Sequence, residues 1–320
     1  MPAAMMSFLP VLLSLSTSSL SQVPSPVVGG IPAKPGAWPD AVAVIAPHAA
    51  CTGTLITPDV VLTAGHCIDT GPAIVVVDTT DYGAPGGEAI RVKSAMAYPS
   101  WETSYDVGVV VLEHAAKTKP RSVAAACTVR AGLVAGARVE IVGFGLTTKA
   151  GTGGNSRLHQ AQLSVGDAAC SGSAGCNPAI APGGEFTAGG DDKDACYGDS
   201  GGPIYVDAPG GPALLGVVSR AASLAGQPCD GGGIYVRADK VVSWIQRVTH
   251  ETVTRTHCAG AADGADDEGA AGGAGDAPEG SQQAGGCAAG GGAGGSLVIG
   301  LGALAMAGLA RRRARAAQSA

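Results

Sequence analysis

Short apolar runs separated by polar turns follow one another along the first part of the chain. The runs are Ala41–Ile45, Thr54–Ile56, Val60–Leu62, Ile74–Val77, Ile90–Ala97 and Val107–Leu112. Turn-forming stretches such as Thr57-Pro58-Asp59 and Asp69-Thr70-Gly71-Pro72 lie between them. Because short strands at regular intervals with turn residues between them are typical of all-β proteins, the pattern predicts an all-β body.

A second series of apolar runs follows a Gly- and Ala-rich connection after Ser122. These runs are Val139–Gly145, Leu158–Val165, Ile204–Val206, Ala213–Ser219 and Gly232–Val236. The period then changes over Lys240–Val248, where Val241, Val242, Ile245 and Val248 share one face of a helix. The pattern therefore predicts a second β body and a closing helix.

The two ends of the chain differ from this central part. Residues 1–21 hold an apolar segment, Phe8–Leu15, and then a Ser/Thr cluster with small residues suited to cleavage. This arrangement predicts a secretory signal peptide, and an apolar leader without that role is the alternative. Residues 22–26 would then be a short propeptide.

Residues 259–286 are Gly, Ala and acidic residues with almost no large apolar side chain, so they predict a disordered linker. The tail, 287–320, holds the apolar run Leu297–Ala310 followed by four arginines. With the Ala/Gly stretch before it, this run reaches about 20 residues, enough for one membrane-spanning helix with the arginines on the cytoplasmic side. A low-complexity tail without a membrane role is the alternative.

Composition narrows the class of protein. Charged residues are 14% of the 320 residues and the net charge is −6, and no basic patch indicates nucleic-acid binding. The 9 cysteines include no Cys-x-x-Cys pair, which favours an exported protein in an oxidising compartment over a metal or redox protein. No group of His, Cys and carboxylate residues has metal-ligand spacing, so we expect no metal and no organic cofactor.

The stretch Asp194-Ala195-Cys196-Tyr197-Gly198-Asp199-Ser200-Gly201-Gly202-Pro203 is the strongest candidate for chemistry. Glycines on both sides of Ser200 allow backbone conformations closed to other residues, so that two N–H groups can point at one oxyanion. The pattern Gly198-x-Ser200-x-Gly202 also fits the nucleophile elbow of α/β-hydrolases. Alone it is ambiguous, and a glycine turn with an idle serine remains open.

Two further stretches settle the class. Leu62-Thr63-Ala64-Gly65-His66-Cys67 and Tyr105-Asp106-Val107-Gly108 each place a triad-type residue at the edge of an apolar run. The order His66, Asp106, Ser200 differs from that of an α/β-hydrolase, whose histidine comes last. From about Val27 to Val248 the chain resembles the trypsin-like, chymotrypsin-fold serine peptidases.

The resemblance implies a domain at 27–250 built of two six-stranded antiparallel β-barrels with a C-terminal helix. It also implies peptide-bond hydrolysis by acyl transfer, with Ser200 as nucleophile, His66 as general base and Asp106 orienting the imidazole. The N–H groups of Gly198 and Ser200 would form the oxyanion hole. Protein or peptide substrates are the implied partners.

The resemblance further implies a zymogen. In this family a cut before a segment such as Val27-Val28-Gly29-Gly30 frees an amine that pairs with the aspartate beside the catalytic serine, here Val27 with Asp199. Pro26 stands where the family usually has Arg or Lys, so the activating peptidase is open.

Asp194 matches the floor of the family's primary specificity pocket, which implies cleavage after Arg or Lys. Ser219 and Gly233 match other pocket residues. The sequence Ser219-Arg220-Ala221 departs from the family's Ser-Trp-Gly: Ala221 adds a methyl at the pocket mouth, and the charge of Arg220 would oppose a basic substrate side chain. A non-basic preference is therefore the alternative.

Among the cysteines, the resemblance implies the pairs Cys51–Cys67 and Cys196–Cys229. Cys170 and Cys176 are close enough for a small loop bridge, and Thr187 stands where the family's usual partner of Cys170 would fall. The pairing of Cys127, Cys258 and Cys287 stays open.

The tail resembles the MYXO-CTERM type of bacterial sorting segment, with Cys287 at the key position. We therefore expect an exported bacterial serine endopeptidase, secreted or anchored at the cell surface through this tail, with a plain tail anchor as the alternative. A catalytically silent binding or adhesion module of the same family and an esterase of another fold are the rival hypotheses.

Overall fold

The computed structural model describes residues 27–153, 156–172, 175–190, 192–222 and 226–258. The expected signal peptide and propeptide (1–26), the linker (259–286) and the tail with Cys287 lie outside these ranges. Within the described ranges no helix has the length and apolar character needed to cross a membrane.

The first β body is a closed antiparallel barrel with the strand order β2-β3-β4-β7-β6-β5. Its strands are β2 (Ala41–Ala46), β3 (Ala49–Thr57), β4 (Val60–Thr63), β5 (Ile74–Val77), β6 (Glu88–Ala97) and β7 (Gly108–Leu112). Every apolar run predicted in this region forms a strand, and β3 begins five residues before its run. Side chains such as Val42, Leu55 and Val110 fill the barrel interior with no exposed surface.

The second β body is a seven-stranded antiparallel sheet in the order β1-β9-β8-β11-β12-β13-β10. Its strands are β1 (Ile31–Pro32), β8 (Arg138–Gly143), β9 (His159–Ser164), β10 (Glu185–Ala188), β11 (Pro203–Val206), β12 (Ala213–Ala221) and β13 (Gly233–Arg237). The expectation of a second closed six-stranded barrel needs correction. A seventh strand, β1, pairs with the first residues of β9. The chain at the end of β9 meets β10 through the Val165–Ala188 bridge and through backbone bonds such as Gly189 N–H to the Ser164 carbonyl at 3.1 Å.

Short helices connect and close the two bodies. They are α1 (Gly65–Ile68), η1 (Trp101–Thr103), α2 (Ala126–Gly132), η2 (Ala238–Lys240) and α3 (Val242–Thr249). The predicted closing helix is confirmed as the single turn η2 followed by α3, whose Trp244 and Ile245 are buried. Helix α2 was not predicted, because the connection after Ser122 shows no clear helical period.

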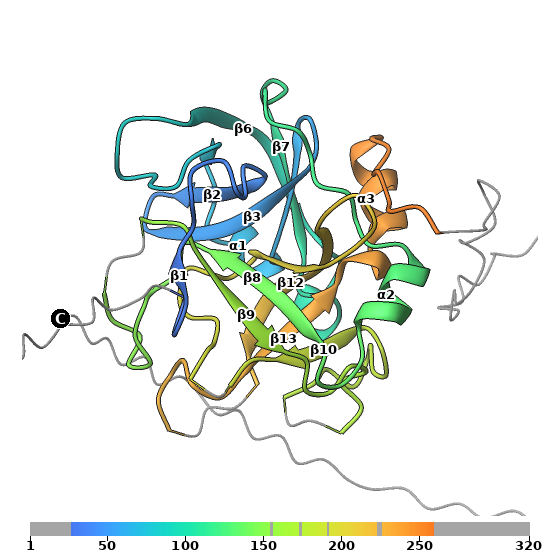
Figure 1. The fold of residues 1–320 in the computed structure, drawn as a ribbon. Helices are drawn as coiled ribbons and strands as arrows, with labels where there is room; N and C mark the ends of the chain where they lie inside the picture. Colours follow the sequence, from blue (N-terminus) through green and yellow to red (C-terminus); the bar gives the residue numbers. More distant parts are fainter. Residues whose placement is uncertain (1–26, 154–155, 173–174, 191, 223–225, 259–320) are drawn as a thin grey trace, which may run out of the picture. The chain divides into compact units, whose positions relative to one another are not determined.

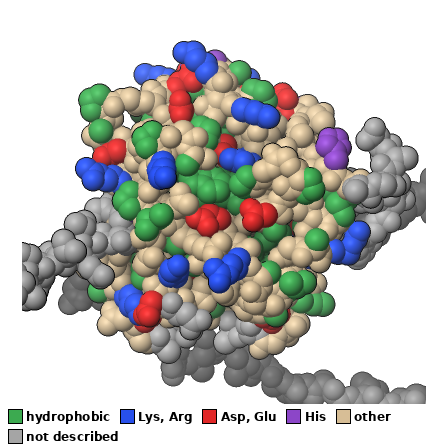
Figure 2. Space-filling view, viewed as in Figure 1, with side chains coloured by type: hydrophobic (Ala, Val, Ile, Leu, Met, Phe, Trp, Pro, Cys, Tyr) green, Lys and Arg blue, Asp and Glu red, His purple; other side chains and the backbone are tan. Residues whose placement is uncertain are grey.

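One apolar cluster spans the two bodies, and each body also has a cluster of its own. Ala41, Leu62 and Val109 of the first barrel pack in the same cluster as Val142 and Tyr205 of the second sheet. On the face shown in Figure 2, acidic and basic side chains are interspersed around apolar ones. The end of β4, the start of β7 and the end of β12 meet at the boundary between the bodies, and this meeting point positions the candidate site.

Candidate active site

His66 and Asp106 are brought together by the register of two paired strands. Thr63 at the end of β4 lies opposite Gly108 at the start of β7. His66, three residues after Thr63, therefore lies close to Asp106, two residues before Gly108. Asp106 Oδ2 lies 2.9 Å from His66 Nδ1, and Asp106 Oδ1 accepts the His66 backbone N–H at 3.0 Å. These two contacts fix both the ring and the backbone of the histidine.

Asp106 is buried and carries an additional hydrogen bond. Ser219, on β12 of the second sheet, donates its hydroxyl to Asp106 Oδ2 at 2.7 Å. Burial alone would raise the pKa of Asp106, but the hydrogen bonds from His66 and Ser219 and the nearby imidazole outweigh it and hold the pKa below its ordinary value. Asp106 is therefore a carboxylate able to stabilise an imidazolium.

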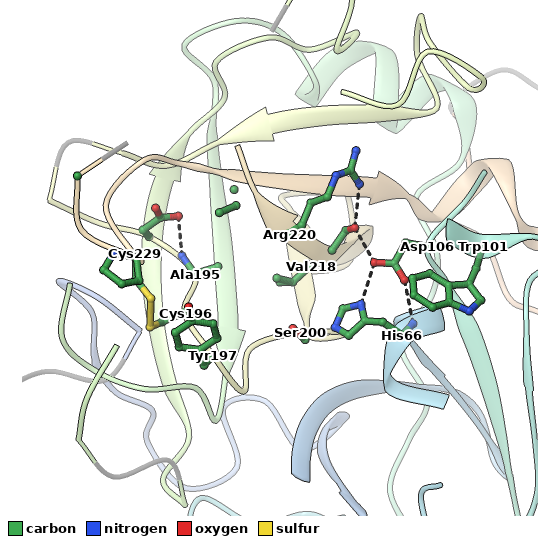
Figure 3. A pocket seen from close by; sticks show the side chains of 16 residues that line it. His66, Trp101, Asp106, Ala195, Cys196, Tyr197, Ser200, Val218, Arg220 and Cys229 are labelled. Carbon is green, nitrogen blue, oxygen red and sulfur yellow. Dashed lines mark hydrogen bonds and ion pairs between the residues drawn. A yellow bond between two sulfur atoms is a disulfide. The ribbon is translucent and has the colours of Figure 1, made fainter. Parts of the chain in front are cut away.

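Ser200 lies in the same cavity as the His66 ring, in the loop before β11 (Figure 3). Its carbonyl accepts the N–H of Thr52, which attaches the loop to the first barrel. Gly198 and Gly201 have φ angles of +96° and +79°, and a Cβ at Gly201 would come 2.0 Å from Thr63 Oγ1. Only glycine fits this turn.

The backbone donors of this turn point to an anion site. Among the described residues, neither the Gly198 N–H nor the Ser200 N–H donates to a protein acceptor. Two free N–H groups beside a serine hydroxyl are the donors that a developing oxyanion requires.

Asp199 is fully buried beneath the turn. Its Oδ1 accepts the Gly145 N–H at 2.8 Å, and its Oδ2 accepts the Cys196 N–H at 2.9 Å. Burial raises the pKa of Asp199 to about 7 despite these bonds. The Val27 residue is also buried in the second sheet's core, and its nitrogen is an amide of the Pro26–Val27 bond in this chain.

The cavity next to Ser200 has a volume of about 630 Å³ and includes Asp194, Ser219, Ala221 and Gly233 in its lining. Asp194 is buried, and its carboxylate accepts N–H bonds from Ala195 and Gly232, both at 2.8 Å. Burial raises the pKa of Asp194 to about 6. The cavity thus holds a buried acidic side chain whose bonds to two backbone N–H groups favour its ionised form.

Arg220 does not behave as the sequence suggested. Its guanidinium forms an ion pair with Glu185, with Nη1 to Oε1 at 2.7 Å and Nη2 to Oε2 at 3.0 Å. This pairing neutralises the charge that was expected to oppose a basic substrate side chain. Glu185 was missed by the sequence reasoning, because β10 is a four-residue strand with no recognisable pattern of its own.

Trp101 is a second residue that the sequence reasoning missed. Its ring lies 6.2 Å from the His66 ring, and a Cβ at Gly65 would come within 2.8 Å of its side chain. Glycine at position 65 therefore lets the indole pack against the histidine helix and line the cavity.

Four disulfides join cysteines within the described ranges. Cys51–Cys67 holds the histidine helix, Cys196–Cys229 lies at the cavity wall, and Cys170–Cys176 closes a small loop. Cys127 pairs with Cys258, a pair that the sequence left open. In the described part, the group of Cys51, His66 and Cys67 has three metal-type ligands within 4.8 Å, but both sulfurs are joined to each other and cannot bind a metal as thiolates.

Comparison with known proteins agrees with this geometry. The family model named Trypsin matches residues 27–245. Chymotrypsin-like elastase family member 1 of Bos taurus is 30% identical over 252 residues, which cover 73% of this chain and 94% of that protein. Protein masquerade of Drosophila melanogaster is 30% identical, over 69% of this chain and 23% of that protein. Coagulation factor XII of Sus scrofa is 29% identical, over 70% of this chain and 39% of that protein. The chain, matched by the family model over more than half its length, belongs to the trypsin family.

Proposed function

We propose that this protein is a serine endopeptidase that cleaves peptide bonds after Arg or Lys. The hydrogen-bonded His66–Asp106 pair, beside Ser200 in a cavity that holds the buried carboxylate of Asp194, carries the proposal. Family membership supports a serine-type hydrolase in general.

In the proposed reaction, Ser200 Oγ attacks the peptide carbonyl and His66 takes the hydroxyl proton. Asp106 holds the imidazole with Nδ1 protonated and stabilises the imidazolium that forms. The N–H groups of Gly198 and Ser200 bind the oxyanion, each contributing about 3 kcal/mol in comparable sites. The imidazolium then protonates the leaving amine, and water, deprotonated by His66, releases the acyl group.

The preference for a basic residue follows from Asp194. A desolvated substrate cation needs a counter-charge. Two buried acids line the cavity, and Asp106 is already bound to His66, so Asp194 is the carboxylate left for the substrate. The pairing of Arg220 with Glu185 supports the basic preference, because it leaves no unpaired guanidinium to repel the substrate.

We further propose that cleavage after Pro26 activates the protein. The new Val27 amine would pair with Asp199, a buried carboxylate with no ion pair among the described residues. In the same proposal, residues 1–21 direct export, residues 259–286 are a linker, and Cys287 with the following tail retains the protein at the cell surface. The four disulfides are consistent with an oxidising compartment.

The test uses the full chain with residues 22–26 replaced by the recognition sequence of a peptidase that leaves Val27 as the first residue. After the cut, Arg and Lys peptides are expected to be hydrolysed, and a fluorophosphonate is expected to label Ser200. The Ser200→Ala variant should lose both signals, and Asp194→Asn should lose Arg and Lys cleavage while retaining the label.

Cleavage only after Phe or Ala would keep the mechanism and overturn the role of Asp194. A folded, correctly cut protein with no label and no hydrolysis would overturn the enzymatic proposal and favour a binding module of the same family.

A further inference from the structure

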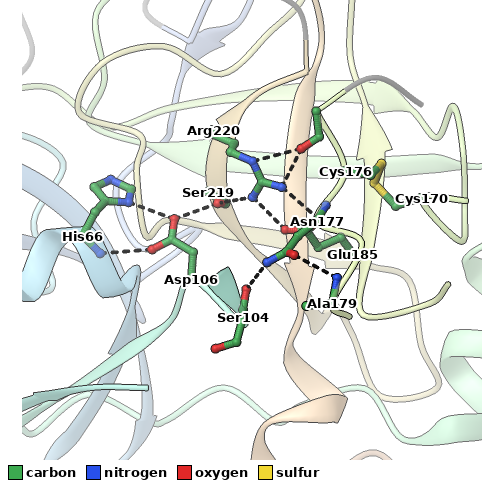
Figure 4. A network of polar contacts seen from close by, with 11 residues as sticks. His66, Ser104, Asp106, Cys170, Cys176, Asn177, Ala179, Glu185, Ser219 and Arg220 are labelled. Carbon is green, nitrogen blue, oxygen red and sulfur yellow. Dashed lines mark hydrogen bonds and ion pairs between the residues drawn. A yellow bond between two sulfur atoms is a disulfide. The ribbon is translucent and has the colours of Figure 1, made fainter. Parts of the chain in front are cut away.

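Arg220 lies at the centre of a polar network that reaches the candidate triad (Figure 4). Besides its two bonds to Glu185, the guanidinium donates to the Gly175 carbonyl from Nε at 3.2 Å and from Nη2 at 2.7 Å. Its Nη1 also donates to Ser219 Oγ at 3.0 Å. One side chain therefore connects β10, the loop closed by Cys170–Cys176, and the serine that contacts Asp106.

The contact with Ser219 determines where that hydroxyl proton goes. An arginine can only donate hydrogen bonds, whereas a serine hydroxyl donates one and accepts others. Because Arg220 uses an acceptor site of Ser219 Oγ, the Ser219 proton is directed to Asp106 Oδ2, 2.7 Å away. A charged donor also polarises the hydroxyl and strengthens its bond to the carboxylate.

Glu185 holds the guanidinium in this position. Its side chain is 1% exposed, and its Oε2 also accepts the Asn177 N–H at 2.8 Å. Glu185 and Arg220 lie on strands that flank β13, so the ion pair bridges that strand. A buried carboxylate with two charged hydrogen bonds fixes a guanidinium far better than solvent would.

The loop beside Arg220 also makes a hydrogen bond to the segment that precedes Asp106. Asn177 Nδ2 donates to the Ser104 carbonyl at 2.8 Å, two residues before Asp106. The loop that carries Gly175 and Asn177 thus contacts both Arg220 and the segment that presents Asp106.

We propose that Arg220 and Glu185 form a positioning pair for the triad, acting through the Ser219 hydroxyl to hold Asp106 in its catalytic orientation. This inference rests on the proposed peptidase function. Neither residue touches the reacting atoms; both act through Ser219.

Several ionisable groups surround this network and would share in any pH effect. Those on neighbouring elements are His66 on α1, Tyr105 beside Asp106, Asp194 in the cavity, and the Arg237–Asp239 ion pair beyond Tyr105. None of them is changed by the variants below.

The main variant is the double substitution Glu185→Gln with Arg220→Gln. It replaces the ion pair by two amides, and an amide can either donate to or accept from Ser219. We expect kcat to fall about tenfold with KM changed less than about twofold, because only the protonation and orientation of the catalytic base change. Asp106 would lose polarisation from the cation through Ser219, so the acid limb of the kcat/KM pH profile should rise by about half a pH unit.

Ser219→Ala supplies the decisive comparison. If the pair acts through Ser219, the double substitution should have no further effect in the Ser219→Ala background, so the combined effects are strongly non-additive. Arg220→Lys keeps the positive charge but loses the planar guanidinium that binds two acceptors at once. It should shift the acid limb of kcat/KM by less than the double substitution does.

Arg121→Lys is the matched control. Arg121 makes a comparable two-pronged ion pair with Asp40, whose side chain is also 1% exposed, but it contacts Tyr205 and Pro212 rather than the site. This control should lower the melting temperature as much as Arg220→Lys and leave the acid limb in place.

The proton NMR signal of the His66 Nδ1–H reads its hydrogen bond to Asp106 Oδ2 without turnover. A change of that chemical shift in the double variant that disappears in the Ser219→Ala background supports the positioning pair. An unchanged signal, or an equal change in that background, overturns it. If the cut wild-type protein neither hydrolyses peptides nor reacts with a fluorophosphonate, the peptidase proposal fails, and the NMR signal still decides whether the pair positions Asp106.

Discussion

Asp199 is a buried carboxylate whose hydrogen-bond partners would change if the proposed cut before Val27 takes place. Gly143 and Gly145 are required beside it, because a Cβ at either position would come within 2.3 Å of an Asp199 carboxylate oxygen or carbon. With both sides closed by backbone, the carboxylate is desolvated and receives only N–H bonds from the uncut chain. Burial therefore favours the protonated form of Asp199 as long as no cation pairs with it.

This residue gives the uncut protein a characteristic pH dependence. The folded-state pKa of Asp199, about 7, lies above its ordinary value of 3.8, so the folded state binds more protons than the unfolded state between these pH values. The contribution of Asp199 to the free energy of unfolding should therefore fall as pH rises from about 4 to about 7, by roughly 3–4 kcal/mol. Denaturant unfolding of the uncut chain across this range measures the effect.

Asp199→Asn is the control. It should remove this contribution from the pH dependence of the free energy of unfolding. After the cut that frees the Val27 amine, an ion pair would favour the carboxylate, so the fall should shrink or reverse. An uncut wild-type protein with the same slope as Asp199→Asn would contradict the raised pKa.

At the scale of single elements, the loop closed by Cys170–Cys176 replaces a longer-range bridge. Thr187, which stands where the family's partner cysteine would be, accepts the Asp167 N–H at 2.8 Å through its hydroxyl. A hydrogen bond thus joins β10 to Asp167, just before the loop. Cys170 pairs instead with Cys176, six positions later, and this disulfide closes the loop on itself. The loop then presents the Gly175 carbonyl to Arg220.

The loop disulfide should matter more for rate than for stability. Its cysteines are separated by 6 positions, so chain entropy predicts a loss of only about 2 kcal/mol when both become serine. The Cys170→Ser/Cys176→Ser variant should nevertheless lower kcat severalfold, because the Gly175 carbonyl no longer holds Arg220. Thermal unfolding and steady-state kinetics on the same preparation separate the two effects, and an unchanged kcat would contradict the link.

At the scale of the whole molecule, the two β bodies are held together by a shared core and by covalent and polar ties. Asp40, before β2, accepts hydrogen bonds from Arg121 in the connection and from Tyr205 of β11. Cys127 on α2 is joined to Cys258 near the end of the described chain. The Thr256 hydroxyl accepts the Ala125 N–H beside it, so the C-terminal segment docks on the connection between the bodies.

The Cys127–Cys258 bridge should contribute the larger share of disulfide stability. Its cysteines are 131 positions apart, for which chain entropy predicts a stabilisation of about 5 kcal/mol. In Cys127→Ser/Cys258→Ser, we expect a large fall in melting temperature and faster hydrogen exchange over residues 250–258, while the acid limb of kcat/KM stays unchanged. A melting temperature equal to that of the Cys170/Cys176 variant would contradict the dependence on loop length.

The sequence by itself predicted the strands of the first barrel, most of the second sheet and the closing helix. These elements are local: alternation and apolar runs depend on neighbours a few residues away. It also singled out His66, Asp106 and Ser200, because each lies in a distinctive local motif and their order excludes another fold. Their catalytic role remains a prediction, and the expected leader, linker and tail lie outside the described residues.

Only the tertiary structure decided which distant residues meet. Arg220 was expected to oppose a basic substrate, but a carboxylate 35 positions earlier neutralises it, and that partner lies on a strand too short to recognise. The pairing of Cys127 with Cys258 and the pairing of β1 with β9 depend in the same way on strand order and register. Local sequence patterns determine the strands and helices. The partner of a buried charge or thiol depends instead on packing across the sheet, because desolvation penalises every arrangement that leaves a buried charge unpaired.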